Sequence, residues 1–368
     1  MKHRVLQLIT RLPVGGAERL IADTVRKLDR SRYEPVVCCI QARGEMATEI
    51  ERAGVPVICL ERMKSKRFDW GAVGVLERLL RSERIGLVHS HLYHANLYGR
   101  LACRRAGVPA VVSVHNTYTS PKLHRRLINR FLARSTKRVI AVSEDIKRDL
   151  MRHDGIPAGR IVVISNGVDF ARLSTSTTRA QARLRLGIGE ATLAVGCVAR
   201  LEEQKGHRFL LEAMSLLRDL PMRLFVVGDG RLRSELEQRA ASLGVGNSTT
   251  FLGMRSDVPD ILPALDIYAM PSLWEGLSIA LLEAMAAGLA VVATDVGGVG
   301  QVFGEVECGV RVSPGNAGEL AQAMRALAVA PARRAALGAQ ARRRAVDRFS
   351  LDATLAALTT VYEEALQR

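Results

Sequence analysis

The sequence contains no long uncharged apolar segment of the kind that crosses a membrane. A membrane-spanning helix needs about 20 apolar residues, and no run of that length in this chain is free of Asp, Glu, Lys and Arg. Met1 is soon followed by a short apolar strand, Val5–Thr10, which is too brief for the hydrophobic region of a signal peptide. We therefore expect a cytoplasmic protein without a leader or a membrane span.

Motifs for metal ions and dinucleotides are also missing. The six cysteines occur singly or as one adjacent pair, without C-x2-C spacing, and we expect them to be buried reduced thiols. No D-x-D metal motif occurs. The fingerprint G-x-G-x-x-G is absent too, which disfavours an oxidoreductase with a dinucleotide cofactor. We therefore expect no metal ion and no cofactor.

Aromatic residues make up only 4% of the chain, whereas aliphatic residues are abundant. This composition is typical of parallel sheets covered by helices. Strands are predicted at 4–10, 34–41, 55–60, 87–90, 110–115, 139–142 and 161–164, and then at 192–198, 222–228, 249–252, 266–270, 290–294 and 310–312. Helical patterns lie between them, for example at 17–28, 70–84, 316–328, 332–349 and 351–366. The alternation predicts an α/β protein with doubly wound sheets.

The length of 368 residues suffices for two domains, each with its own core. The turn signal Asn166-Gly167-Val168-Asp169 and a Ser/Thr cluster at 174–178 indicate a boundary. We predict an N-terminal domain at 1–170, a linker at 171–190 and a C-terminal domain at 191–350. Ligands of doubly wound sheets bind at the carboxyl ends of the strands, so we expect a ligand in a cleft between two facing domains.

The net charge of +16 is unevenly distributed. Residues 1–168 contain 31 Lys and Arg against 15 Asp and Glu, whereas residues 169–368 contain 22 of each. The whole excess therefore belongs to the first half. Such asymmetry predicts that one domain faces an anionic partner, which the charge alone leaves open as lipid headgroups, phosphorylated acceptors or nucleic acid.

The most informative segment is Ser272–Gly298, which places Glu275 and Glu283 eight positions apart in almost uncharged surroundings. Glu275 is expected in a turn before a helix, and Glu283 roughly two turns inside that helix. Free N–H groups near Ser278 and Ile279 would form an anion site at the helix start. Both glutamates could instead be solvated helix charges, but apolar neighbours make Glu283 a carboxylate that needs partners.

Two cations, Arg200 and Lys205, flank the loop after the strand at 192–198. They could converge on one diphosphate, although two basic loop residues are often simply solvated. The turn Leu12–Glu18 carries Gly15 and Gly16, which allow a close backbone approach to a phosphate or sugar, or simply form a tight turn. His115 ends a strand, where it could be structural or functional. His89, His91 and His94 form a cluster without an accompanying carboxylate or cysteine, so a metal site there is the less favoured interpretation.

The spacing Glu275-x7-Glu283, the run Glu283-Ala-Met-Ala-Ala-Gly288 and the pair Gly297-Gly298 resemble the signature of retaining glycosyltransferases of family 4. The resemblance covers nearly the whole chain and implies the GT-B architecture of two Rossmann-like domains. It also implies that the C-terminal helix at 351–368 packs back on the first domain. Two positions depart from the family pattern, because Ala290 stands where proline is common and Gly300-Gln301 where Pro-Glu is common.

The resemblance implies a role for each candidate residue. Glu275 would bind the hydroxyls of the donor sugar, Glu283 those of the ribose, and Arg200 and Lys205 the diphosphate. His115 would orient the sugar, and the turn at Gly15 and Gly16 would contact the donor phosphate and the acceptor. The remaining donor-binding candidates are Gly276, Leu277, Ser278, Ile279, Met254 and Arg255, the last two near the base.

Two basic stretches account for much of the charge in the first half. One is 62–70, with Arg62, Lys64, Lys66 and Arg67 beside Phe68 and Trp70. The other is Lys122–Arg138, whose cations include Arg125, Arg126, Arg130 and Arg134 beside an apolar stripe. Both could contact an anionic membrane surface, and the second has the pattern of an interfacial helix. The alternative is a core-packed helix with a solvated outer face.

We therefore expect a retaining, metal-independent glycosyltransferase that moves a sugar from a nucleoside diphosphate to a hydroxyl of a sugar or glycolipid. Cell-surface polysaccharide, lipopolysaccharide or glycolipid synthesis at the cytoplasmic face of the membrane would suit such an enzyme. A catalytically silent nucleotide-sugar-binding protein is the alternative. A nucleic-acid binder would fit the charge, but the basic stretches match no recognised module. The sequence does not identify the donor base, the sugar or the acceptor.

Overall fold

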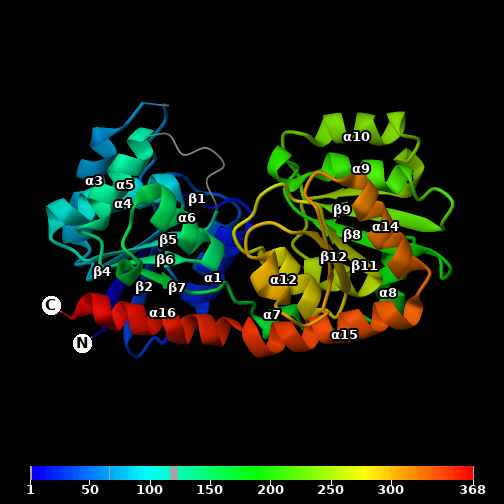
Figure 1. The fold of residues 1–368 in the computed structure, drawn as a ribbon. Helices are drawn as coiled ribbons and strands as arrows, with labels where there is room; N and C mark the ends of the chain where they lie inside the picture. Colours follow the sequence, from blue (N-terminus) through cyan, green and yellow to red (C-terminus); the bar gives the residue numbers. More distant parts are fainter. Residues whose placement is uncertain (1, 66, 117–122, 368) are drawn as a thin grey trace. The chain divides into compact units, whose positions relative to one another are not determined.

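The computed structural model describes residues 2–65, 67–116 and 123–367. The chain divides into two compact units, each built on one parallel sheet covered by helices (Figure 1). Unit 1 comprises Met1–Gly167 together with Leu351–Arg368, and unit 2 comprises Val168–Ser350.

Unit 1 contains a seven-stranded parallel sheet in the order β3-β2-β1-β4-β5-β6-β7. Its strands are β1 (His3–Arg11), β2 (Tyr33–Ala42), β3 (Val57–Cys59), β4 (Leu87–His91), β5 (Ala110–Val114), β6 (Arg138–Ala141) and β7 (Ile161–Val163). Its helices are α1 (Gly16–Lys27), α2 (Met46–Arg52), α3 (Trp70–Ser82), α4 (Tyr93–Ala106), α5 (Leu123–Ala133), α6 (Glu144–Asp154) and α16 (Leu351–Leu366). The strand order reverses between β1 and β4, as in other doubly wound sheets.

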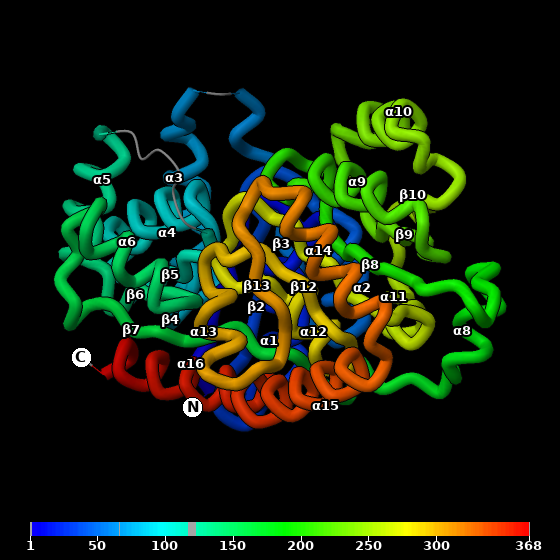
Figure 2. The backbone as a smooth tube through the Cα atoms, turned by 45° about the vertical axis from the view of Figure 1, so that its right-hand side comes forward, coloured from blue at the N-terminus to red at the C-terminus, as the bar shows by residue number. Residues whose placement is uncertain are grey.

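Both faces of this sheet are buried, because helices cover each of them. Along β1, Leu6 and Leu8 point into a cluster with residues of α3 and α4, whereas Val5 points into a cluster with residues of α16. This alternation follows from the period of two in a strand. Gln7, on the same face as Val5, is also fully buried. Helix α16 packs against α1, β4 and β5, and its course can be followed in Figure 2.

Unit 2 contains a six-stranded parallel sheet in the order β10-β9-β8-β11-β12-β13. Its strands are β8 (Leu193–Val198), β9 (Met222–Val227), β10 (Thr249–Gly253), β11 (Ile267–Met270), β12 (Ala290–Thr294) and β13 (Val310–Val312). Its helices are α7 (Phe170–Leu173), α8 (Arg179–Arg185), α9 (His207–Ser215), α10 (Arg233–Ser242), α11 (Val258–Ile261), α12 (Ile279–Ala286), α13 (Val299–Phe303), α14 (Ala317–Ala328) and α15 (Pro331–Arg348). The order reverses between β8 and β11, which makes their carboxyl ends the expected ligand position.

All of the predicted strands are present, and their ends differ from the prediction by at most two residues. Residues 171–190, predicted as a linker, instead contain α8 and most of α7 and cluster with unit 2. Side-chain bonds hold this stretch in place, because Thr175 and Thr177 donate to Asp260 and Arg179 pairs with Asp266. No helix in the described part of the chain is long and apolar enough to span a membrane.

Candidate functional site

Three loops follow the central strands β8, β11 and β12 of unit 2, and their backbones touch. Gly206 has φ +64°, and a Cβ atom there would lie 2.0 Å from the carbonyl oxygen of Pro271. Gly297 has φ +54°, and its Cβ would lie 2.2 Å from the carbonyl oxygen of Glu275. Gly298 N donates to Gly276 O at 2.6 Å. Only glycine permits both the positive φ and these approaches, so the loops are fixed to one another.

The contact between these loops encloses the carboxylate of Glu275, which is only 5% exposed. Its Oε1 accepts from Lys205 Nζ at 2.5 Å and from Ser272 Oγ at 2.8 Å. The surrounding turn is fixed because Gln204 donates to the carbonyl oxygen of Trp274 at 2.8 Å. A buried charge requires a paired and hydrogen-bonded setting of this kind. The structure therefore brings two of the predicted catalytic residues, Glu275 and Lys205, together directly.

The second carboxylate of the pair, Glu283, is the fifth residue of α12 and is 8% exposed. The prediction of two turns is wrong, because α12 begins only at Ile279 and Glu283 lies little more than one turn inside it. Glu283 forms an ion pair with Arg172 of α7. The apolar surroundings of Glu283 indicated that it needs a partner, but nothing local identifies a residue 111 positions away.

The N-terminus of α12 lies between these two glutamates in the sequence. Ser278 is the N-cap, and its side chain accepts from Leu281 N at 3.3 Å. The first N–H groups of a helix have no partner within the helix, and here they belong to Ile279 and its neighbours. Leu277 is buried and Ser278 partly exposed. The predicted turn–helix arrangement for an anion is therefore present at the carboxyl end of β11.

The other predicted diphosphate-binding cation, Arg200, and the predicted base-binding pair are more exposed. Arg200 lies two residues after β8, and within the described ranges its side chain has no hydrogen bond or ion pair. Met254 is 50% exposed. Arg255 makes a bidentate pair with Asp257, at 2.7 and 2.5 Å. Since exposed pairs of this kind contribute little, Arg255 remains able to exchange its partner.

In unit 1, the predicted Gly-Gly turn forms the start of α1. Gly15 is the N-cap in extended conformation, and Gly16 is the first helical residue. A Cβ atom on Gly15 would lie 2.4 Å from Glu18 Oε2, so the carboxylate of Glu18 lies over the turn. Glu18 is 8% exposed. No role was predicted for Glu18, although its position three residues after an N-cap is a recognisable signal.

His115 follows β5 and is buried against the other histidines of unit 1. Its Nε2 lies 3.0 Å from His91 Nδ1, and His91 Nε2 lies 2.8 Å from Gln7 Oε1. His89 bonds to Tyr362 and Ser113, both at 2.7 Å. His94 is exposed on α4 and apart from this group. The described residues contain no cluster of His, Cys, Asp and Glu that could hold a metal ion.

Burial sets the protonation of these histidines. It lowers the pKa of His115 to about 4 and that of His89 to about 3, and it holds the pKa of His91 well below the usual value. In each case the loss of water around the charged form is the main cause. The three imidazoles are therefore neutral at pH 7.

The two basic stretches differ in how they are arranged. Arg62, Lys64 and Arg67 are exposed, while Lys66 lies outside the described residues. In the second stretch, which begins outside the described part with Lys122, α5 exposes three apolar side chains at helical spacing, Leu123, Leu127 and Phe131. Its buried side instead carries Asn129, Leu132 and Ala133.

The predicted membrane-contact arginines of this second stretch have different surroundings. Arg125 lies over the ring of Tyr93, 4.5 Å from its centroid, and Arg126 donates to the carbonyl oxygen of His153. Arg130 and Arg134 are exposed. Helix α5 therefore has one buried side, while a large part of its apolar surface is exposed.

Two family profiles match the chain. The profile described as Glycosyltransferase Family 4 matches residues 14–172, and the one described as Glycosyl transferases group 1 matches residues 179–344. UDP-Gal:alpha-D-GlcNAc-diphosphoundecaprenol alpha-1,3-galactosyltransferase from Escherichia coli is 31% identical over 301 residues, which are 77% of this chain and 77% of that protein.

Two further proteins extend the comparison. D-inositol 3-phosphate glycosyltransferase from Rhodococcus erythropolis is 32% identical over 316 residues, which are 79% of this chain and 71% of that protein. The crystal structure of Anabaena HepE in complex with UDP-glucose is similar with a TM-score of 0.86 at 25% identity, over 98% of this chain and 99% of that one.

We predict that Gly206→Ala destabilises the protein far more than Gly187→Ala. Gly187 has φ +62° but no atom within 4 Å of its would-be Cβ, so alanine there costs about 1 kcal/mol of left-handed strain. At Gly206 the same strain is joined by overlap with Pro271 O, and the total should be on the order of 3 kcal/mol. Urea unfolding of both variants measures the difference. Equal losses would show that the loops after β8 and β11 are not held in contact.

We predict that stability falls as the pH is lowered from 6.5 toward 4. In the unfolded chain a histidine has a pKa of about 6.5, above the folded values of His89, His91 and His115. The unfolded state therefore binds more protons in this window, and each buried histidine costs about 1.4 kcal/mol per pH unit. Urea unfolding at pH 7.5 and pH 5 tests this. His124→Gln, at an exposed position, should leave the slope unchanged; a flat profile for the wild type would contradict the prediction.

Proposed function

We propose that this chain, which belongs to glycosyltransferase family 4, transfers a hexosyl group from a uridine diphosphate sugar to a hydroxyl of a sugar or glycolipid. The protein is a glycosyltransferase, and its fold is GT-B with two Rossmann-like sheets. The main structural support for the proposed hexosyl transfer is the buried Lys205–Glu275 pair at the carboxyl ends of β8 and β11.

The choice of a uridine diphosphate sugar is supported by two relatives. The E. coli protein is named for UDP-Gal, and HepE was crystallised with UDP-glucose. The name of the E. coli protein also specifies an acceptor sugar carried on diphosphoundecaprenol. A sugar on a lipid carrier would place this chain in polysaccharide, lipopolysaccharide or glycolipid synthesis.

We propose that Glu275 binds the hydroxyls of the donor sugar. Its Oε1 already accepts from Lys205 and Ser272, and a carboxylate oxygen that remains available can accept from sugar hydroxyls. Lys205 then has two tasks, because its ammonium group carries three donors and can neutralise Glu275 while it also donates to a phosphate oxygen. The pair thus links recognition of the sugar to binding of the leaving group.

The diphosphate would be bound by Arg200, Lys205 and the first N–H groups of α12. Arg200 has no partner in the described part of the chain and can turn toward a ligand. A helix N-terminus adds donors aimed at an anion. Such groups stabilise the negative charge that develops as the diphosphate departs. This arrangement supports transfer without a metal ion.

The nucleoside would contact Glu283 through the ribose hydroxyls and the loop at Met254 and Arg255 through the base. Glu283 is held by Arg172, which keeps one carboxylate in place for two adjacent hydroxyls. In unit 1, we propose that His115 contacts the donor sugar and that Gly15 and Gly16 approach the phosphates or the acceptor.

The proposed reaction retains the configuration at the anomeric carbon. The acceptor oxygen bonds to that carbon on the face from which the diphosphate leaves, while the bond to the phosphate oxygen breaks. The departing diphosphate takes the proton of the acceptor hydroxyl. The chain's own residues bind, orient and neutralise charge, and none of them forms a covalent bond with the sugar.

We predict that Glu275→Gln lowers the transfer rate on the order of 100-fold, because the amide keeps the shape but cannot bear the charge that Lys205 and the sugar hydroxyls require. Lys205→Ala should have an effect of similar size. The measurement is UDP release with UDP-galactose and UDP-glucose, with and without EDTA. The control is Arg325→Ala, which removes the exposed pair with Asp219 and a hydrogen bond to the carbonyl oxygen of Leu216. Wild-type rates in either site variant would refute the assignment, and loss of activity in EDTA would refute metal independence.

We further propose that α5 and the stretch 62–70 bring the protein to the cytoplasmic face of an anionic membrane. Leu123, Leu127 and Phe131 form an exposed apolar stripe on α5, flanked by arginines. A basic residue near an anionic leaflet contributes about 1 kcal/mol, so several of them and the stripe would hold the enzyme reversibly where a lipid-linked acceptor lies.

We predict that replacing Arg125, Arg126, Arg130 and Arg134 by Ser releases the protein from anionic vesicles in a sedimentation assay. Leu127→Ser with Phe131→Ser should weaken binding further, because these side chains insert into the interface. The matched control replaces four exposed arginines of unit 2 by Ser, namely Arg231, Arg333, Arg343 and Arg348. Equal sedimentation of the four-arginine α5 variant and the unit 2 variant would refute membrane contact by α5.

A further inference from the structure

A continuous chain of buried hydrogen bonds joins α16 to His115. Gln7 Nε2 donates to Tyr362 Oη at 2.9 Å, His91 Nε2 bonds to Gln7 Oε1 at 2.8 Å, and His91 Nδ1 meets His115 Nε2 at 3.0 Å. A side branch runs from Tyr362 through His89 to Ser113. Every member of this chain is at least nine-tenths buried. No role was predicted for Gln7 or Tyr362 from the sequence.

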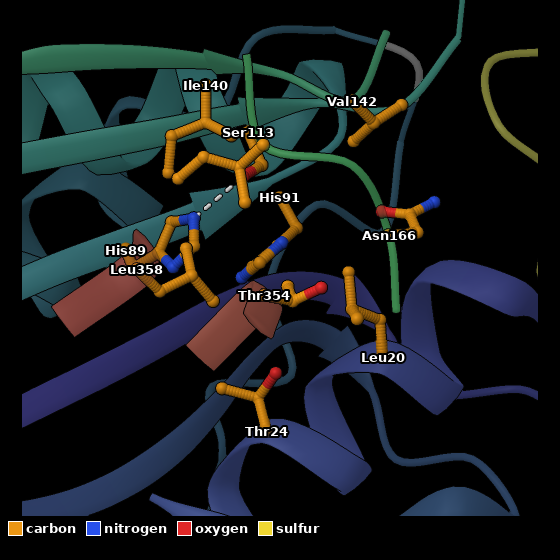
Figure 3. Close-up of a pocket in the computed structure, with 11 residues that line it drawn as sticks. Leu20, Thr24, His89, His91, Ser113, Ile140, Val142, Asn166, Thr354 and Leu358 are labelled. Atoms are coloured by element: carbon orange, nitrogen blue, oxygen red, sulfur yellow. Dashed lines mark hydrogen bonds between the residues drawn. The ribbon is translucent and has the colours of Figure 1, made fainter. Parts of the chain in front are cut away.

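The cavity beside these hydrogen-bonded side chains is too small for a substrate. Figure 3 shows His89 and His91 lining a cavity together with Thr354 and Leu358 of α16 and Leu20 and Thr24 of α1. The cavity has a volume of about 10 Å³, which is about the room that one water molecule needs. The histidines therefore act on one another and on His115 rather than on a ligand of their own.

The hydrogen-bond partners of these side chains determine which ring nitrogen of each histidine carries a proton. Gln7 donates to Tyr362 through its nitrogen, so its Oε1 accepts from His91 Nε2. His91 is neutral because burial holds its pKa far below the usual value. A neutral imidazole that carries its proton on Nε2 has only a lone pair on Nδ1. His115 Nε2 must then supply the proton between the two rings.

We propose that Gln7 and Tyr362 are positioning residues that hold His115 in one tautomer, with its proton on Nε2 and a lone pair on Nδ1. Nδ1 of His115 makes no hydrogen bond to the residues that the structure describes. This nitrogen is therefore available to accept a hydrogen bond from a hydroxyl of the donor sugar. That contact rests on the proposed function.

The orientation of the Gln7 amide selects between two arrangements of the protons along these hydrogen bonds. If its amide were turned over, its nitrogen would donate to His91 Nε2, and every proton along the chain would move to the other partner. His115 would then carry its proton on Nδ1 and could only donate there. Tyr362 ends this series of bonds at α16, because its Oη accepts from Gln7 Nε2 and lies 2.7 Å from His89 Nδ1. The C-terminal helix thus supplies the acceptor toward which the amide nitrogen of Gln7 is turned.

The test is the tautomer itself. Long-range proton–nitrogen correlation spectra of the ¹⁵N-histidine-labelled protein at pH 7 distinguish a proton on Nε2 from one on Nδ1, and His115→Gln assigns the signal. We expect the Nε2 tautomer in the wild type. Gln7→Met should give the Nδ1 tautomer or a mixture, and should lower the transfer rate about tenfold, the effect of one hydrogen bond in the transition state. Tyr362→Phe provides a second, milder break in the same chain.

The control is Val361→Ala, which removes buried apolar contacts beside Tyr362 but no hydrogen bond, and should leave the tautomer and the rate unchanged. A proton on Nδ1 in the wild type, or an unaltered spectrum or rate in both Gln7→Met and Tyr362→Phe, overturns the proposal. The spectra need no substrate, so they decide it even if the wild type transfers no sugar. In that case it is the proposed function that fails.

Discussion

A carboxylate enclosed by protein needs a cation and hydrogen-bond donors, and in unit 2 this requirement is set by Glu275. Lys205 meets it from the loop after β8, and Ser272 from the loop after β11. For both to reach one oxygen, the loops must approach more closely than side chains allow. Gly206 makes that approach possible, and Gly297 does the same for the loop after β12, which touches the backbone of Glu275. The ion pair and the glycines therefore depend on each other. Without the glycines the loops would lie apart, and without the ion pair the buried charge would have no charged partner.

The sequence predicted most of the fold because its elements follow from local patterns. Apolar strands and their glycine-rich ends recur throughout, and each predicted strand is present. The break at Ser350 between α15 and α16 was equally visible. The start of α12 was placed less well, because the apolar period continues back to Leu277 while the N-cap Ser278 determines where the helix begins. The predicted linker failed for a similar reason, since the side chains of Thr175 and Thr177 bond to Asp260 rather than to water.

Partners that lie far apart in the sequence were not predictable. Arg172 pairs with Glu283 across 111 positions, and Tyr362 bonds to Gln7 across 355. Nothing in the neighbourhood of any of these residues indicates the other, because the contact is created by the sheet order and the return of α16 to unit 1. The sequence did show that partners are needed, because polar residues stand inside apolar runs. A buried polar residue in a strand predicts that a partner exists, and only the fold identifies it.

The two units use different chemistry at their strand ends, and the difference follows from burial. In unit 2 full charges are kept, because Lys205 and Glu275 neutralise each other. Among the described residues of unit 1, no carboxylate joins the hydrogen bonds of these histidines, so burial removes their charge, as the pKa of about 4 for His115 shows. A charged imidazole could only donate, whereas a neutral one has a donor and an acceptor in fixed places. A diphosphate requires cations, and a sugar hydroxyl is recognised better by a neutral group whose lone pair is held in a known direction.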